Sequence, residues 1–138
     1  FASLLASGAL TFVGGVYVNT VPYNIVLESL YLPDRFIDKL KKDLDYILKS
    51  NILSIEYIVL FGSCVNGKLK VTSDIDLLII TNETPSQLQR GDIAAELAEP
   101  INSVATDAIF YTVDEIKSGK TLFLKQIMEE GIVIWKKD

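Results

Sequence analysis

Two aspartates separated by one residue, Asp74 and Asp76, begin an otherwise apolar run that continues through Ile80. In a β-strand, residues i and i+2 point to the same face, so both carboxylates would face one way. Asp is disfavoured in strands, and two neighbouring carboxylates resist ionising together. A divalent cation removes both penalties, and Mg²⁺ prefers a few carboxylate oxygens completed by water and phosphate. The pair therefore predicts a site for Mg²⁺ and a nucleotide.

Simpler roles are open for each of these carboxylates. Asp74 could cap a turn after Ser73, and calcium binding is another option, although no EF-hand pattern follows. Asp76 precedes four apolar residues, so its charge would be costly there without a metal ion or a lysine. The metal site is the interpretation that uses both residues.

A Gly62-Ser63 pair ends the apolar segment that precedes the aspartates. Gly62 has no side chain and lets the backbone approach a polyphosphate, while the Ser63 hydroxyl can donate to phosphate oxygens. Ser73 and Lys68 complete the candidate nucleotide-binding set, although a solvated surface role is the simpler alternative for Lys68. A Gly-Ser pair alone is usually just a turn. Its place between two apolar strands, the second opened by Asp-x-Asp, makes it a candidate phosphate site.

A third acidic residue, Asp107, interrupts the apolar strand predicted at 104–111. If this strand lies beside the Asp-x-Asp strand, three carboxylates converge and could hold two divalent ions around an in-line phosphoryl transfer. Asp107 would then also help to deprotonate an acceptor hydroxyl. Pairing with a lysine at the strand edge is the alternative. Asp74, Asp76 and Asp107 are thus the candidate catalytic and metal-binding residues.

The elements that must position these residues follow from periodicity and capping signals. Helices are predicted at 34–50, 84–99, 112–117 and 121–130. Strands are predicted at 55–61, 74–81, 104–111 and 132–135. The resulting order predicts an α+β, two-layer domain in which helices cover a small mixed sheet.

Residue patterns within the helices predict their faces and ends. Asp34 is expected to cap the first helix, and Thr84 with Gln87 to form a capping box at the second. The solvated face of the first helix is expected to carry Lys39, Lys41, Lys42 and Asp43. The inward face of the last helix is expected to carry Leu122, Leu124, Ile127 and Met128. Gly131 is expected to end that helix.

The first 27 residues carry no charge and contain three glycines and Pro22, a poor pattern for a straight membrane-spanning helix. We expect residues 1–33 to form an apolar N-terminal extension and residues 34–138 to form the domain that carries the site. A strand-and-turn segment packed on the core, a partner-binding segment and the tail of something longer are three interpretations of this extension.

Bulk composition narrows the class of protein. With 138 residues and 49% hydrophobic content, the chain predicts one folded domain. The net charge of −5 argues against a nucleic-acid partner, and the single cysteine, Cys64, fits a reducing cytoplasm and a space-filling role. The absence of histidine excludes Ser-His-Asp triads and HExxH zinc sites. Carboxylates, lysines, hydroxyls and backbone amides must carry the chemistry, and oligomeric assembly is left open.

The pattern Phe61-Gly62-Ser63, ten residues, then Asp74-Ile75-Asp76 resembles the signature of the minimal nucleotidyltransferase domain of the DNA polymerase β-like superfamily. Asp107 falls where this family places its third carboxylate. The segment from Phe123 to Trp135 resembles the family's closing helix and strand. The resemblance spans residues 34–137.

This resemblance implies the nucleotidyltransferase fold, with about four or five strands packed against helices. It also implies transfer of a nucleoside monophosphate, usually AMP from ATP, to a hydroxyl group with two Mg²⁺ ions. Asp74 and Asp76 would hold the metals, Asp107 would ligate one and assist the acceptor, and Gly62 and Ser63 would hold the triphosphate. Many family members have a basic residue where this chain has Asn66, which offers a polar contact without positive charge.

Small stand-alone members of the family are often antitoxins encoded beside a helical HEPN-type ribonuclease toxin, which some of them silence by adenylylating a tyrosine. The resemblance therefore implies a HEPN-type protein partner besides a nucleoside triphosphate. Two alternatives stay open at this point. One is a binding module that keeps the fold without catalysis, and the other is nucleotidylation of a small molecule such as an antibiotic, with the acceptor pocket supplied by residues 1–33 or a second subunit.

Overall fold

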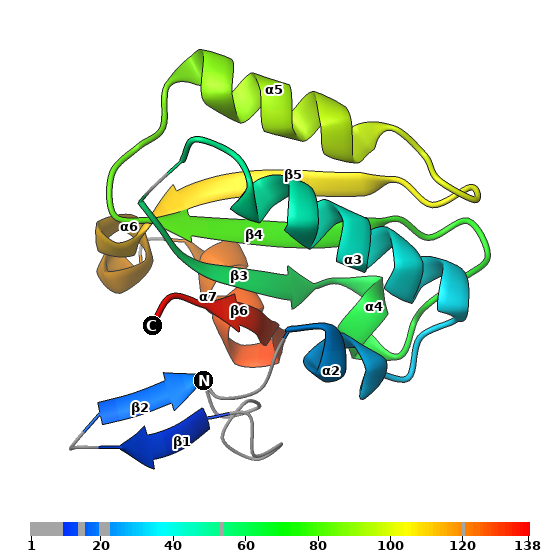
Figure 1. The fold of residues 1–138 in the computed structure, drawn as a ribbon, viewed down its shortest axis with the longest axis horizontal. Coiled ribbons are helices and arrows are strands. Elements are labelled where there is room, and N and C mark those ends of the chain that lie inside the picture. Colours follow the sequence, from blue (N-terminus) through cyan, green and yellow to red (C-terminus); the bar gives the residue numbers. More distant parts are fainter. Residues whose placement is uncertain (1–9, 14–15, 20–22, 53, 120) are drawn as a thin grey trace.

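The computed structural model describes residues 10–13, 16–19, 23–52, 54–119 and 121–138. A four-stranded sheet in the order β5-β4-β3-β6 organises this part of the chain (Figure 1). The strands are β3 (Ile55–Phe61), β4 (Ile75–Thr81), β5 (Thr106–Thr112) and β6 (Ile132–Lys136). β4 is parallel to β5, and β3 is antiparallel to both β4 and β6. The predicted mixed sheet is confirmed, and the two Asp-bearing strands are neighbours.

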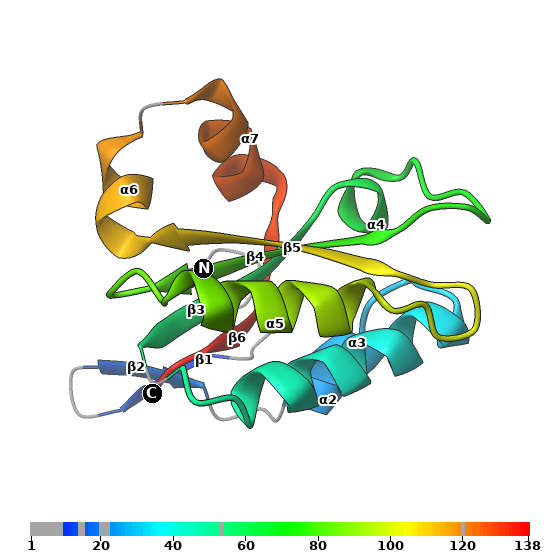
Figure 2. The same ribbon diagram turned by 90° about the horizontal axis from the view of Figure 1, so that it is seen from above.

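Helices cover both faces of this sheet. Figure 2 shows α3 (Asp34–Leu48) and α5 (Gln87–Ala98) on one face and α6 (Val113–Ser118) and α7 (Leu122–Glu130) on the other. A single turn, α4 (Ser63–Asn66), follows β3. The two-layer expectation thus holds for the sheet and the α3–α5 layer, and α6 and α7 add a further partial layer.

The N-terminal part of the described chain contains two short strands and a helix. β1 (Leu10–Val13) and β2 (Val16–Asn19) pair antiparallel in a sheet of their own. α2 (Tyr23–Glu28) then packs against α3, with Leu27 fully buried in the main core. Residues 1–9, 14–15 and 20–22 of the predicted extension lie outside the described residues.

The alternation of β4 separates two hydrophobic clusters. Ile75, Leu77 and Ile79 belong to the cluster that includes buried side chains of α3 and α5. Leu78 and Ile80 belong to the second cluster, together with Ile127 of α7. Because successive strand residues point to opposite faces, Asp76 shares the α7 face with Leu78 and Ile80. Apolar packing on both sides therefore fixes the direction in which the carboxylate points.

Some expected faces and ends differ in the structure. Lys39 and Asp43, expected in solvent, are 1% and 4% exposed, because they lie on the same helical stripe as Phe36, Leu40 and Ile47. Leu122 and Met128, expected inside, are exposed, since α7 buries only its narrow stripe of Leu124 and Ile127.

Two helix starts also differ. Asp34 is the first residue of α3 and makes no capping bond, because Pro33 holds the N-cap position. The capping box of α5 lies two residues later than expected, with Ser86 Oγ accepting from the Gln89 amide and Gln89 Oε1 accepting from the Ser86 amide, each at 3.1 Å. The Ser-x-x-Gln spacing satisfies the box as well as Thr-x-x-Gln does, and it leaves Pro85 outside the helix.

Candidate active site

Asp76 and Asp107 lie side by side on neighbouring strands. They are register partners in the parallel pair of β4 and β5, so both side chains point to the α7 face of the sheet. Asp74 lies one residue before β4 and is exposed, as is Asp107, whereas Asp76 is half-buried. The structure thus brings the three predicted carboxylates to the end of the sheet at which the central strand β4 and the edge strand β5 begin.

The turn that follows β3 lies directly against the carboxylate of Asp76. Phe61 is the register partner of Asp76 on the other side of β4, and Gly62 follows with φ +76°. A Cβ atom placed on Gly62 would lie 2.3 Å from Asp76 Oδ2. A side chain at that position would displace the Asp76 carboxylate, so the glycine suits both the positive φ of this turn and the close approach of the carboxylate.

Electrostatic surroundings set this carboxylate apart. Partial burial, and then the charges of Asp107 and Asp74, raise the pKa of Asp76 to about 6. The ion pairs found among the described residues all involve other carboxylates: Asp43, Glu28, Asp45 and Glu56. The site is therefore a group of negative charges with no basic side chain of the described chain paired to it.

This donor set suits a hard divalent cation. Mg²⁺ commonly takes one or two protein carboxylates and fills its remaining positions with water and substrate phosphates. In the part of the chain that the structure describes, no three acidic or cysteine side chains are gathered closely enough to hold an ion by themselves. The Asp76–Asp107 pair, with Asp74 adjacent, fits an ion that the nucleotide helps to bind.

The predicted nucleotide-binding residues lie in the segment that connects β3 to β4. Ser63 begins α4 and is half-buried, while Lys68 is exposed. Ser73 Oγ accepts from the Lys70 amide at 2.8 Å, and Asn66 Oδ1 accepts from the Lys68 amide at 3.0 Å. Ser73 and Asn66 therefore shape the loop, a role that the sequence pattern did not indicate.

Cys64, next to Ser63, is not a nucleophile. Burial, followed by the negative charge of Asp76, raises the pKa of its thiol to about 12. The thiol stays protonated at neutral pH and packs against the main core, in agreement with the space-filling interpretation.

A cavity beside Gly62 was not foreseen from the sequence. It measures about 180 Å³ and is lined by Phe61, Gly62, Asn66, Phe123, Gln126, Ile127 and Glu130. Phe61 and Phe123 meet edge to face at its wall, with ring centroids 6.1 Å apart. The cavity lies on the β3 side of Asp76, whereas Asp107 lies on the β5 side. It depends on how α7 approaches β3, which local sequence patterns do not specify.

A side chain of α3 joins the two loops that lead into the Asp-bearing strands. Arg35 Nη2 donates to Val71 O at 2.8 Å, and Arg35 Nη1 donates to Asn102 O at 3.3 Å. The first carbonyl precedes β4 and the second precedes β5. This tertiary contact also leaves no signal in the local sequence.

No helix among the described residues is long and apolar enough to cross a membrane.

Comparison with protein families gives one match that covers most of the chain. The profile of the family described as "Polymerase beta, Nucleotidyltransferase" matches residues 42–138. This range contains β3, β4 and β5 and every candidate site residue described above.

Two curated proteins are similar to part of the chain. The protein adenylyltransferase MntA of Shewanella oneidensis is 28% identical over 89 residues, which cover 64% of this chain and 60% of that protein. The candidate protein adenylyltransferase MJ0141 of Methanocaldococcus jannaschii is 28% identical over 98 residues, which cover 71% of this chain and 94% of that protein. The chain thus spans less than two thirds of the first relative and nearly all of the second.

Two solved structures resemble the fold. A crystal structure of a toxin-antitoxin with AMP-PNP contains a chain that is 26% identical, with a TM-score of 0.51 and 73% coverage of each chain. A candidate nucleotidyltransferase from Sulfolobus solfataricus is 17% identical, with a TM-score of 0.54 and coverage of 87% of this chain and 93% of that one. The second structure, with its low identity, supports the nucleotidyltransferase fold of this chain but carries no information on its function.

Proposed function

The chain belongs to the polymerase beta nucleotidyltransferase family, and we propose that it transfers AMP from ATP to a hydroxyl group on a protein partner. The observation that carries this proposal is the placement of Asp76 between Asp107 and Gly62, where no salt bridge found among the described residues joins a basic side chain to any of the three carboxylates. A negative cluster against a glycine turn supports metal-assisted chemistry on a polyphosphate.

The proposed step is a displacement at the α-phosphorus of ATP. A bond forms between the acceptor oxygen and the α-phosphorus, the bond from that phosphorus to the bridging oxygen of the β-phosphate breaks, and pyrophosphate leaves. Asp107 accepts the proton of the acceptor hydroxyl, directly or through water. When bound, Mg²⁺ neutralises phosphate charge and favours the ionised acceptor oxygen.

The other residues have binding roles in this proposal. Asp74 and Asp76, with Asp107, hold the metal ions, while the backbone at Gly62 and the Ser63 hydroxyl contact the triphosphate. The cavity bounded by Phe61 and Phe123 gives the nucleotide space on the side of Asp76 away from Asp107. The exposed side of Asp107 is then open to the acceptor.

A protein acceptor is favoured by the relatives. One of the two relatives is named as a protein adenylyltransferase, the other is a candidate for the same activity, and one similar structure is a toxin-antitoxin. A helical HEPN-type toxin is therefore the partner that we propose for this chain.

The experiment is a transfer assay with a co-expressed partner encoded next to this gene. We expect label from α-³²P-ATP, and none from γ-³²P-ATP, to appear on the partner in the presence of Mg²⁺. Asp76→Asn should lower the rate about 10³-fold or more, since metal-assisted charge stabilisation is worth several kcal/mol. Asp92→Asn, the same change at an exposed position of α5, should leave the rate unchanged. Label transfer that survives Asp76→Asn would contradict the proposal.

A non-catalytic binding module is the second candidate. It is favoured by Asn66, whose side-chain oxygen accepts from the Lys68 amide and which brings no positive charge to the loop. In this case Asp74→Ala/Asp76→Ala would still protect cells from the partner. Loss of protection in that variant, with unchanged complex formation, would favour catalysis.

A further inference from the structure

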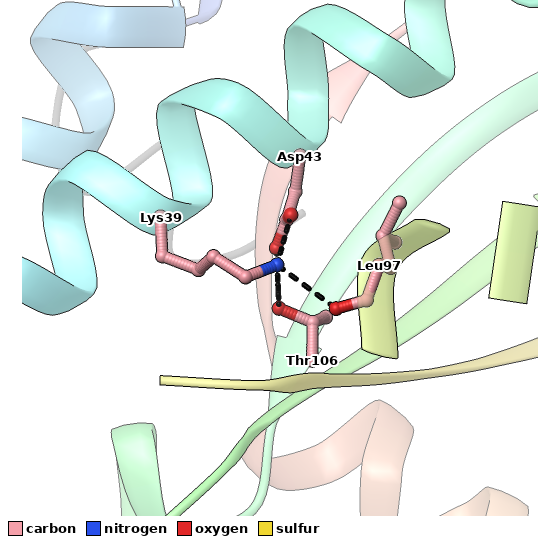
Figure 3. Close-up of polar contacts among 4 residues, drawn as sticks. All are labelled: Lys39, Asp43, Leu97 and Thr106. Atoms are coloured by element: carbon pink, nitrogen blue, oxygen red, sulfur yellow. Dashed lines mark hydrogen bonds and ion pairs between the residues drawn. The ribbon is translucent and has the colours of Figure 1, made fainter. Parts of the chain in front are cut away.

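A buried polar cluster lies on the face of the sheet opposite the carboxylates (Figure 3). Lys39, Asp43 and Thr106 are each at most 4% exposed. Lys39 Nζ donates to the Asp43 carboxylate, to Leu97 O at 2.9 Å and to Thr106 Oγ1 at 3.1 Å. The Thr106 hydroxyl in turn donates to the second carboxylate oxygen of Asp43. Each of these side chains is therefore satisfied by the others.

The cluster ties three elements together at one place. Lys39 and Asp43 belong to α3, Leu97 lies in the last turn of α5, and Thr106 is the first residue of β5. The loop 99–105, which connects α5 to β5, is therefore held at both of its ends. Arg35 of α3 holds the same loop at Asn102 O.

β5 needs such support more than the central strands do. It is an edge strand of the four-stranded sheet and, among the strands that the structure describes, pairs with β4 alone. The first residues of an edge strand have hydrogen bonds to a partner strand on one side only, so they separate more easily than those of a central strand. The contacts to α3 supply attachment from the helix face.

Asp107 is the residue directly after Thr106, and its side chain points to the opposite face. A shift of Thr106 therefore moves Asp107 relative to Asp76. We propose that Lys39, Asp43 and Thr106 are positioning residues that hold Asp107 beside Asp76. This inference rests on the proposed function, because it assigns Asp107 to the metal and acceptor site.

Stability alone is a weak reason for burying this charge pair. Apolar residues of similar volume often replace a buried ion pair without loss of stability. Thr106 Oγ1 accepts a hydrogen bond from Lys39 and donates one to Asp43. These two directional bonds fix the start of β5 in a defined place, whereas packing of apolar side chains would restrict its position less. Metal and acceptor sites need placement to within about 0.5 Å, and support by outer residues provides it.

The decisive variant is Thr106→Val, which removes the hydroxyl and keeps the volume. We expect Mn²⁺ affinity of the full chain with a non-hydrolysable ATP analogue to fall about tenfold. We also expect kcat for AMP transfer to fall ten- to about 100-fold, with KM for ATP within about twofold of the original. Thr106→Ser, which keeps the hydroxyl, should restore both values to within about threefold.

Thr81→Val is the matched control. Thr81 is fully buried on β4, and within the described residues its hydroxyl has no hydrogen-bond partner. The change is chemically the same, but no hydrogen bond of the described residues is lost, so Mn²⁺ affinity and kcat should stay unchanged. Equal effects of Thr81→Val and Thr106→Val, or normal Mn²⁺ affinity in Thr106→Val, would overturn the positioning role. Failure of the original chain to transfer AMP would count against the proposed function instead, and the Mn²⁺ comparison would still decide the role of Thr106.

Discussion

Two carboxylates lie on opposite faces of the sheet near the start of β5, and their surroundings differ. Asp43 is buried and Asp76 is half-buried. Burial is the main cause that raises the pKa of each. At Asp43, hydrogen bonds from Lys39 and Thr106 pull the pKa back down. At Asp76, the neighbouring charges of Asp107 and Asp74 raise it further.

This difference separates an acid that supports the fold from one that is available to a ligand. Asp43 has its compensating cation built into the chain, so its carboxylate is paired without any ion from solution. Asp76 has like charges as neighbours, so its ionised form costs free energy until a cation from solution arrives. A carboxylate that destabilises the free protein and is nevertheless present is a functional candidate.

The sharpest test of the compensated carboxylate, Asp43, is the substitution Lys39→Met. It leaves Asp43 buried without its cation, and we expect the free energy of unfolding to fall by about 3–5 kcal/mol. Urea denaturation at pH 7 measures this. Lys49→Met, which removes the exposed pair that Lys49 makes with Asp45 from the C-cap position of α3, should change stability by about 0.5 kcal/mol or less. Similar losses in both variants would mean that the buried pair is not special.

Gly62→Ala tests Asp76, the uncompensated carboxylate, by changing the backbone position that lies against it. The new Cβ would have to displace the Asp76 carboxylate, so we expect AMP transfer to fall about 100-fold, in addition to about 1 kcal/mol of backbone strain. Gly67→Ala is the control, because Gly67 has φ +78° and nothing within 4 Å of its Cβ position. It should show the strain but keep its activity. Equal activity losses would indicate that backbone strain, and not the carboxylate, is responsible.

The smallest expected effect is a pH dependence of stability in the metal-free protein. The folded-state pKa of Asp76, about 6, lies above the usual value near 3.8, so the folded state binds more protons between these two pH values. Stability should therefore rise as pH falls from 6 to 4, by about 1 kcal/mol after solvent screening is allowed for. Asp76→Asn removes this contribution and leaves that of Asp43. Chemical denaturation in EDTA at several pH values measures the difference, and an identical pH profile in both proteins would argue against it.

The strands of the sheet could be predicted from local patterns. β3 was predicted with the bounds that it has, β4 and β6 to within one residue and β5 to within two. The order of the strands was not predicted, and the place of β5 beside β4 was only a condition of the site hypothesis. Apolar runs and turn residues are local signals, and they suffice for such elements. Strand alternation gives the direction of Asp76, which shares a face with Leu78 and Ile80, whereas Asp74 lies one residue before β4 and outside the strand on which it was expected.

The parts that were missed depend on contacts between distant residues. Lys39 and Asp43 were assigned to solvent because they are charged, although their spacing from Phe36 and Ile47 puts them on the buried stripe of α3. Thr106, which satisfies them, is more than 60 residues away in the sequence. The cavity at Phe61 and Phe123 and the contacts of Arg35 likewise require the packed structure.

The place of β5 at the border of the sheet has a consequence for the choice of acceptor. Asp107 is exposed on a strand with a neighbour on one side only, so a reacting hydroxyl can come near it without entering an enclosed space. Such an opening admits a group carried on a bulky macromolecule as readily as one on a small compound. Selectivity must then come from the surface that surrounds the opening and from how the visiting molecule docks on it.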